Sequence, residues 1–238
     1  MKKLLSILFI AILFANCTNK KEEKITGLIA EKAMVVSARE EASKIGTEIL
    51  KKGGNAFDAM VATELALAVA YPYAGNIGGG GFMVYRKNDG EIGALDYREK
   101  APLAATKNMY LDNQENVIKD KSTVGAMAIG VPGTIAGIFK AQERFGKLDV
   151  ATILKPVIAL AKNGYIITEK QELRIASYDS IFKAVNGKEI LYNKNLKAGN
   201  TLINLNLAET LKRISKNGKD EFYKGKTADM LVKYVQNL

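Results

Sequence analysis

The densest group of side chains able to do chemistry is the run Asp96-Tyr97-Arg98-Glu99, which is followed by Lys100-Ala101-Pro102. A planar guanidinium offers two parallel N–H donors to the two oxygens of a carboxylate, so Arg98 is a candidate to bind a carboxylate ligand. The run also ends a predicted strand, where charged residues often form solvated edges or ordinary salt bridges. The residue types alone leave both interpretations open.

A glycine-rich segment at residues 75–81 could instead bring backbone N–H groups close to an anion. A phosphate loop would need Gly-Lys-Ser/Thr at its end, and a dinucleotide fingerprint starting at Gly78 would need a small residue at Met83. Both motifs also run from strand to helix, whereas this segment runs from a predicted helix to a predicted strand. A tight connector that needs positive φ is at least as good an interpretation.

The residues that are absent narrow the chemistry further. The chain has no histidine and one cysteine, so a Ser-His-Asp triad and a histidine-ligated metal site are both excluded. Ser, Thr, Lys and carboxylates remain as candidate nucleophiles or bases within the chain. The sequence suggests no metal and no organic cofactor.

The first 17 residues predict an export signal. Lys2 and Lys3 precede an apolar run over residues 4–15, which is too short to span a bilayer. Asn16 and Cys17 follow the run, and Phe14-Ala15-Asn16-Cys17 resembles a bacterial lipobox, in which the cysteine is lipidated. The alternative is a soluble secreted protein with a free thiol.

We therefore expect residues 1–17 to be a lipoprotein signal peptide, residues 18–29 a polar tether, and residues 30–238 the folded part. The protein would be exported and anchored by lipid to a bacterial membrane, on the periplasmic side. Its formal charge is +10, but the cationic residues are scattered singly along predicted helices. Nucleic-acid binding is therefore not expected.

The elements that must position these side chains follow from periodicity. A buried strand is predicted at residues 33–37, with a capping box of Ser37 and Glu40 opening a helix that stops at residues 53–54. An almost wholly apolar helix follows at residues 56–70, capped by Asn55. Further expected elements are a hairpin (82–85 and 92–97), a helix at 134–144, one or two helices at 149–162 interrupted or kinked at the proline, and helices at 168–185, 206–217 and near the end of the chain. This order predicts an α/β, or α+β layered, fold with helices covering a small sheet.

Several blocks in succession resemble the large subunit of the gamma-glutamyltransferase (glutathione hydrolase) family. They are Lys52-Gly-Gly-Asn-Ala-Phe-Asp-Ala59, Tyr73-Ala-Gly-Asn-Ile-Gly-Gly-Gly-Gly-Phe-Met83, Asp96-Tyr-Arg-Glu-Lys-Ala-Pro102, Gly130-Val-Pro-Gly-Thr134 and Asp220-Glu-Phe-Tyr-Lys-Gly225. The resemblance covers residues 30–238 in order. It implies an N-terminal-nucleophile hydrolase, a four-layer αββα sandwich that is incomplete in this chain.

The same resemblance implies a mechanism and partners. A threonine exposed by self-cleavage would attack gamma-glutamyl amides such as glutathione and pass the glutamyl group to water or an amine. That threonine is expected beyond Leu238, in a small subunit cut from the same precursor, so we expect the chain to be truncated and inactive alone. Arg98 would pair with the α-carboxylate of the glutamyl group. The alternatives are a related acylase with the same fold, and a lipid-anchored protein that binds small anions without catalysis.

Overall fold

The computed structural model describes residues 27–238. The chain divides into two compact units, Met1–Lys32 and Ala33–Leu238, and the second contains every helix and strand described below. The predicted signal peptide, Cys17 and most of the predicted tether lie outside the described residues. No helix within residues 27–238 combines the length and the hydrophobicity needed to cross a membrane.

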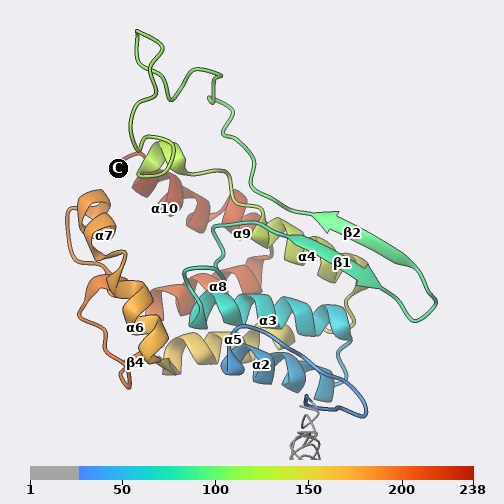
Figure 1. The fold of residues 1–238 in the computed structure, drawn as a ribbon. Coiled ribbons are helices and arrows are strands. Elements are labelled where there is room, and N and C mark those ends of the chain that lie inside the picture. Colours follow the sequence, from blue (N-terminus) through green and yellow to red (C-terminus); the bar gives the residue numbers. More distant parts are fainter. Residues whose placement is uncertain (1–26) are drawn as a thin grey trace, which may run out of the picture. The chain divides into compact units, whose positions relative to one another are not determined.

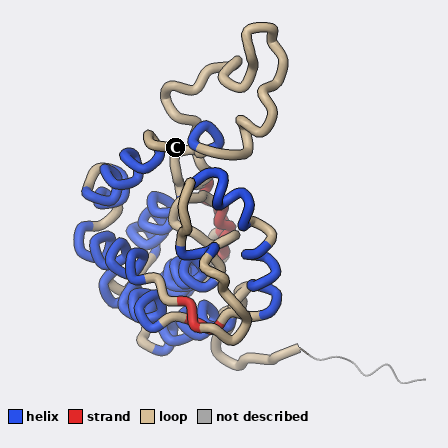
Figure 2. Tube along the Cα trace, turned by 90° about the vertical axis from the view of Figure 1, so that its left-hand side faces the viewer, coloured by secondary structure: helices blue, strands red, loops and turns tan. Residues whose placement is uncertain are grey.

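The second unit is built mainly from packed helices (Figures 1 and 2). Helix α2 (Glu40–Lys51) packs on α3 (Ala56–Ala70), α3 packs on α5 (Val150–Asn163), and α5 packs on α8 (Leu205–Asn217). Their facing side chains form one hydrophobic core. The core is therefore centred on α3 and α5.

Helix α3 has the bounds that the sequence predicts. Asn55 caps it by accepting hydrogen bonds from Phe57 N and Asp58 N, and the Asp58 carboxylate accepts one from Asn55 N at 2.9 Å. Asp58 is fully buried, and it also accepts hydrogen bonds from the backbone N–H groups of Lys147 and Leu148. This carboxylate therefore joins the start of α3 to the loop between α4 (Thr134–Phe145) and α5.

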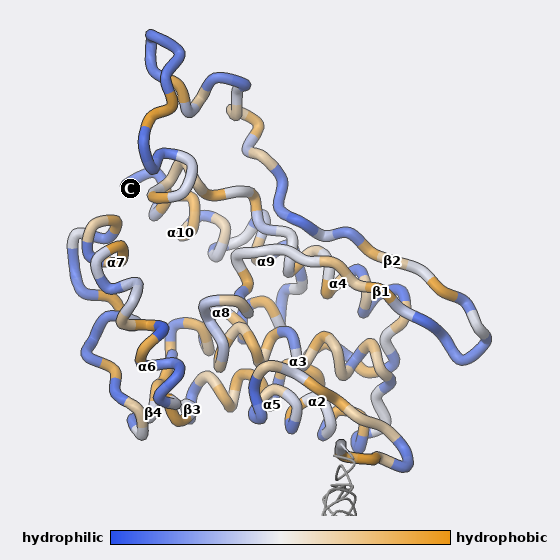
Figure 3. The backbone as a smooth tube through the Cα atoms, in the orientation of Figure 1, coloured by the Kyte–Doolittle hydropathy of each residue, from blue (hydrophilic) through white to orange (hydrophobic). Residues whose placement is uncertain are grey.

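Strands β1 (Phe82–Arg86) and β2 (Ile92–Asp96) form an antiparallel hairpin, with Phe82 opposite Asp96. Gly90 in the turn has φ 91°, which a glycine adopts without strain. One face is covered, since Met83 is 8% exposed, whereas Val84 on the other face is 83% exposed. The turn itself is hydrophilic (Figure 3).

The chain between β2 and α4 is a long loop that contains the short 3₁₀ helix η1 (Ala126–Ala128) and is visible at the top of Figure 1. After α5 come β3 (Tyr165–Ile166), α6 (Glu169–Ala176), α7 (Asp179–Asn186), η2 (Leu191–Asn193) and β4 (Thr201–Leu202). Strands β3 and β4 pair antiparallel. Helix α8, the short α9 (Asp220–Tyr223) and α10 (Lys226–Val235) complete the unit.

Three local predictions were wrong. Residues 33–37 form no strand, because no other described strand pairs with them. Ser37 does not cap α2; its hydroxyl lies 2.8 Å from the Ser43 hydroxyl, and Arg39 is the N-cap residue. The helix predicted at 168–185 is divided into α6 and α7 by a turn at residues 177–178, although its Thr168–Gln171 capping box is present.

Candidate functional site

Three segments that are distant in sequence meet at the end of β2. Gly79 O accepts hydrogen bonds from Gly133 N (2.7 Å) and Thr134 N (3.0 Å), which ties the glycine-rich segment to the start of α4. Gly81 and Tyr97 exchange two backbone hydrogen bonds, of 3.3 and 3.0 Å. The structure thus brings together the glycine run, the Asp96–Glu99 run and residues 130–134.

The glycine run serves close backbone packing. A Cβ atom on Gly80 would lie 2.6 Å from Tyr97 O, and one on Gly133 would lie 1.9 Å from the same oxygen. No glycine between residues 75 and 81 has positive φ. The predicted need for positive φ is therefore wrong. At Gly80 and Gly133 a side chain is excluded because the backbone of Tyr97 occupies the space.

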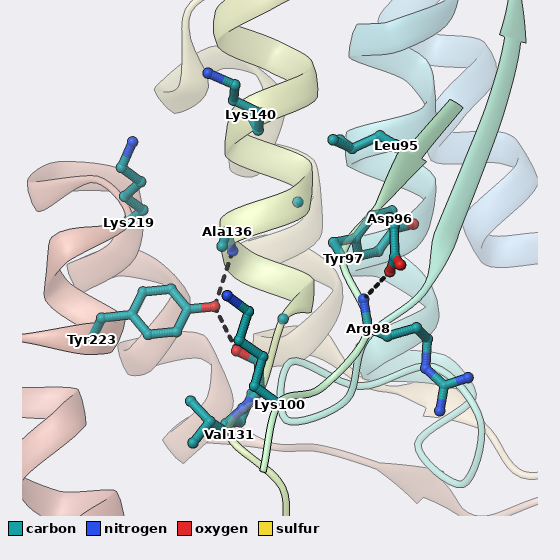
Figure 4. A pocket seen from close by; sticks show the side chains of 13 residues that line it. Leu95, Asp96, Tyr97, Arg98, Lys100, Val131, Ala136, Lys140, Lys219 and Tyr223 are labelled. Carbon is teal, nitrogen blue, oxygen red and sulfur yellow. Dashed lines mark hydrogen bonds between the residues drawn. The ribbon is translucent and has the colours of Figure 1, made fainter. Parts of the chain in front are cut away.

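A pocket of about 440 Å³ opens beside this junction (Figure 4). Tyr223 of α9 bounds it, with its hydroxyl donating to Pro132 O at 2.9 Å and accepting from Ala136 N at 3.1 Å. The lining includes the basic residues Arg98, Lys100, Lys140 and Lys219. The pocket is therefore basic, with the Asp96 carboxylate as its acidic component.

Arg98 lies at the surface, with 58% of its side chain exposed. Its Nε donates to Glu99 Oε2 at 2.8 Å, and its guanidinium carbon lies 5.6 Å from the Phe82 ring centroid. The ion pair raises the pKa of Arg98 and lowers the pKa of Glu99. Within residues 27–238, the terminal nitrogens Nη1 and Nη2 have no hydrogen-bond partner. The guanidinium points away from Lys100 and Tyr223 (Figure 4), so Arg98 forms a salt bridge and still presents two donor groups to solvent.

Sequence reasoning missed that Tyr97 and Glu64 of α3 affect each other's pKa. Burial raises the pKa of the Tyr97 hydroxyl to about 12, and the neighbouring Glu64 adds to this rise. Burial also raises the pKa of Glu64, while its contact with Tyr97 acts in the opposite direction. The available signal was Glu64 itself, an acid in an otherwise apolar helix.

The described residues offer no alternative catalytic centre based on a metal. Nowhere in residues 27–238 do three His, Cys, Asp or Glu side chains gather where they could hold a metal ion. The most buried carboxylate, Asp58, is used by backbone N–H groups. The chemistry that the site supports is recognition of an anion by the Arg98 guanidinium.

Comparison with known proteins identifies relatives over almost the whole folded part. A family model described as gamma-glutamyltranspeptidase matches residues 42–238. A glutathione hydrolase proenzyme from Pseudomonas sp. (strain A14) is 49% identical over 207 residues, which are 85% of this chain. The chain spans 36% of the length of that relative.

Solved structures give the same result. A gamma-glutamyltranspeptidase from Helicobacter pylori superimposes with a TM-score of 0.85 at 39% identity, over 89% of this chain and 62% of that one. A gamma-glutamyltranspeptidase from Pseudomonas nitroreducens complexed with L-DON gives 0.82 at 43% identity, over 88% and 62%. The arrangement of residues around Arg98 thus belongs to a fold shared with these structures.

Proposed function

The chain belongs to the gamma-glutamyltranspeptidase family, and we propose that the protein containing it cleaves gamma-glutamyl amides such as glutathione. The glutamyl group would pass to water or to an amino acid or peptide. The observation that carries this proposal is the family match, together with the unoccupied donor groups of Arg98 in the matched region.

The reaction needs a residue from outside this chain. In the proposed mechanism the hydroxyl of an N-terminal threonine attacks the gamma-carbonyl carbon, and the threonine α-amine takes the hydroxyl proton. The C–N bond breaks, the departing amine receives the proton, and a glutamyl ester remains on the threonine. Water or an acceptor amine then attacks this ester and releases the glutamyl group. The threonine would lie in a small subunit from the same precursor, which the proenzyme description of the Pseudomonas relative supports.

Arg98 would hold the α-carboxylate of the glutamyl group. Glu99 occupies Nε on one edge of the guanidinium, so Nη1 and Nη2 remain for the two carboxylate oxygens. The Glu99 pair also restricts rotation of the side chain. Arg98 would thereby orient the glutamyl chain toward the threonine.

The role of Arg98 is tested in the full-length protein. In the full-length protein the second subunit would complete the pocket and desolvate the pair between Arg98 and the substrate carboxylate. Removing one partner of a desolvated charge pair costs about 2–5 kcal/mol, and about 1.4 kcal/mol corresponds to a tenfold change. Arg98→Ala should therefore lower kcat/KM on a gamma-glutamyl chromogenic amide by at least about tenfold, and by up to about a thousandfold. Arg98→Lys should restore part of the loss, because lysine keeps the charge and loses the two-pronged geometry.

The matched control is Arg86→Ala, which removes an exposed arginine from the same hairpin and should leave kcat/KM unchanged. Self-cleavage should continue in all three variants, since it needs no bound glutamyl group. If Arg98→Ala cleaves itself normally and retains wild-type kcat/KM, Arg98 is a surface charge and its proposed role is wrong.

Two alternative functions predict different results with amide substrates. A related acylase would hydrolyse an amide that lacks the α-carboxylate, and would then tolerate Arg98→Ala. A lipid-anchored binding protein for small anions would turn over no amide at all. Assaying the full-length wild type on a gamma-glutamyl amide and on the matching butyryl amide, which lacks both the α-amino and the α-carboxylate groups, separates the three.

A further inference from the structure

The first turn of α4 has no side-chain cap of its own. Its N-cap residue is Gly133, which offers no side chain to accept a hydrogen bond from the helix. The first backbone N–H groups of a helix also find no partner within it. Gly133 N and Thr134 N donate to Gly79 O, as described above. Ala136 N, one turn into the helix, therefore needs an acceptor from another part of the chain.

Tyr223 supplies this acceptor from 87 residues away. Its hydroxyl accepts a hydrogen bond from Ala136 N at 3.1 Å and donates one to Pro132 O at 2.9 Å (Figure 4). In an α-helix, an N–H group bonds to the carbonyl oxygen four residues earlier, and Ala136 and Pro132 have this spacing. The hydroxyl thus joins two backbone groups at the point where α4 begins.

The segment held by this hydroxyl lies against the main chain of Arg98. Val131 and Lys100 exchange two backbone hydrogen bonds, of 2.7 and 3.1 Å. A Cβ atom on Gly133 would lie 2.8 Å from Arg98 O. Pro132 lies between these two contacts in the sequence. A shift of Pro132 would therefore move the backbone that carries the guanidinium.

Tyr223 is itself fixed, because its neighbours anchor α9. The Glu221 side chain is 6% exposed, and its Oε1 accepts hydrogen bonds from Arg213 Nε at 3.0 Å and from Thr227 Oγ1 at 2.8 Å. Phe222 is buried in the hydrophobic core. Burial raises the pKa of the Tyr223 hydroxyl, which therefore keeps its proton at neutral pH and remains a donor.

We propose that Tyr223 is a positioning residue for Arg98. Its two hydrogen bonds fix the first turn of α4 and the segment before it, and this segment fixes the Arg98 backbone. The proposal rests on the proposed function, in which Arg98 must meet the substrate carboxylate in one orientation.

The test uses Tyr223→Phe in the full-length protein, which keeps the ring and removes both hydroxyl hydrogen bonds. KM for a gamma-glutamyl chromogenic amide should rise by about three- to tenfold, the effect of roughly one hydrogen bond. kcat should stay within about twofold of wild type, because Arg98 binds a carboxylate that keeps its charge throughout the reaction. An unchanged KM would overturn the proposal.

Tyr192→Phe is the matched control, since it removes a hydroxyl from another partly buried tyrosine. The Tyr192 hydroxyl accepts a hydrogen bond from Asn204 at 3.3 Å, and Tyr192 does not line the pocket beside Arg98. This variant should leave KM unchanged. A rise equal to that of Tyr223→Phe would indicate a general structural effect and would also overturn the proposal.

A second background separates positioning of Arg98 from an effect on the rest of the pocket. In an Arg98→Ala protein, Tyr223→Phe should lower kcat/KM no further, because the residue that it positions is absent. A further loss of the same size in that background would overturn the proposal.

If the wild type cleaves no gamma-glutamyl amide, the proposed function fails separately, and amide hydrogen exchange then tests the positioning. Exchange over residues 97–100 should be faster in Tyr223→Phe than in wild type and in Tyr192→Phe. Equal exchange over these residues in the two variants would overturn the proposal, as would faster exchange confined to residues 131–136.

Discussion

Two acids in α3 show how environment determines what a carboxylate does. Asp58, at the first turn, is buried but accepts hydrogen bonds from Asn55, Lys147 and Leu148, so its lone pairs are used. Glu64, near the middle, is partly desolvated, and this burial raises its pKa. Asp58 therefore joins elements together, whereas Glu64 carries a raised pKa beside the candidate site.

The raised pKa of Glu64 predicts a pH-dependent contribution to stability. Because the folded-state pKa lies above the unfolded value near 4.5, the contribution is present below that value and is lost as pH rises through the folded pKa. The side chain introduced by Glu64→Gln stays neutral, so the variant should gain stability relative to wild type from pH 4 to pH 7, seen as a larger free energy of unfolding. Urea denaturation at both pH values measures this.

Glu172→Gln provides a control of opposite sign. The backbone N–H of Ala198 and the ammonium of Lys197 lower the pKa of Glu172, so its contribution is present above the unfolded value and is lost as pH falls. This variant should therefore lose more stability at pH 7 than at pH 4. Equal pH trends in the two variants would contradict the opposite pKa shifts of Glu64 and Glu172.

At the scale of elements, the site depends on how closely α4 approaches the end of β2. Gly137 faces the Tyr97 ring, and Gly133 faces the Tyr97 carbonyl oxygen. A side chain at either position would separate the two elements, because neither the ring nor the backbone can move aside without breaking the hairpin's contacts. Gly137 of α4 and its N-cap residue Gly133 thus allow the close approach of α4 to the segment that carries Arg98.

Gly137→Ala should consequently destabilise the protein. Alanine favours a helix interior by about 1 kcal/mol over glycine, but its Cβ would lie 2.2 Å from Tyr97 Cγ, and overpacking of this kind costs about 1–3 kcal/mol. We expect a net loss of stability in urea denaturation and a raised KM. Gly78→Ala is the control, since its nearest neighbour is 3.7 Å away, and it should be nearly neutral. A Gly137→Ala protein as stable as wild type would show that α4 does not pack tightly against the Tyr97 ring.

At the scale of the whole molecule, the predicted N-terminal-nucleophile hydrolase fold is confirmed by its similarity to gamma-glutamyltranspeptidase structures. The chain spans 62% of each of those two structures. The outer face of the β1–β2 hairpin is apolar and exposed, at Phe82, Val84 and Ile92. In an αββα sandwich such a face packs on a second sheet.

We therefore predict that purified residues 18–238 alone are inactive and of low stability. They contain no residue that maps to the threonine nucleophile, and the exposed hairpin face favours association. Turnover above buffer on a gamma-glutamyl chromogenic amide would refute the first part. A cooperative, monomeric unfolding transition would refute the second.

We also propose that the protein is exported and lipid-anchored through Cys17. When cells are labelled with a fatty acid, the wild type should carry the label and be found in the membrane fraction. The Cys17→Ser variant should carry no label. An unlabelled, soluble wild type would leave the alternative of a secreted protein with a free thiol.

The sequence by itself determined the features that depend on neighbouring residues. Asn55 caps the buried helix, the two predicted strands pair as a hairpin, and the ordered blocks identify the family. Helix hydrogen bonds and caps join residues three or four apart, so they can be predicted from local patterns.

Only the tertiary structure decided the features that depend on distant residues. The predicted strand at 33–37 is unpaired because a strand needs a partner from elsewhere in the chain. Gly80 is required by the backbone of Tyr97, which lies 17 residues further along the chain, and the pKa of Glu64 depends on a tyrosine 33 residues away. Such contacts form when packing brings segments together, and no local pattern encodes that distance.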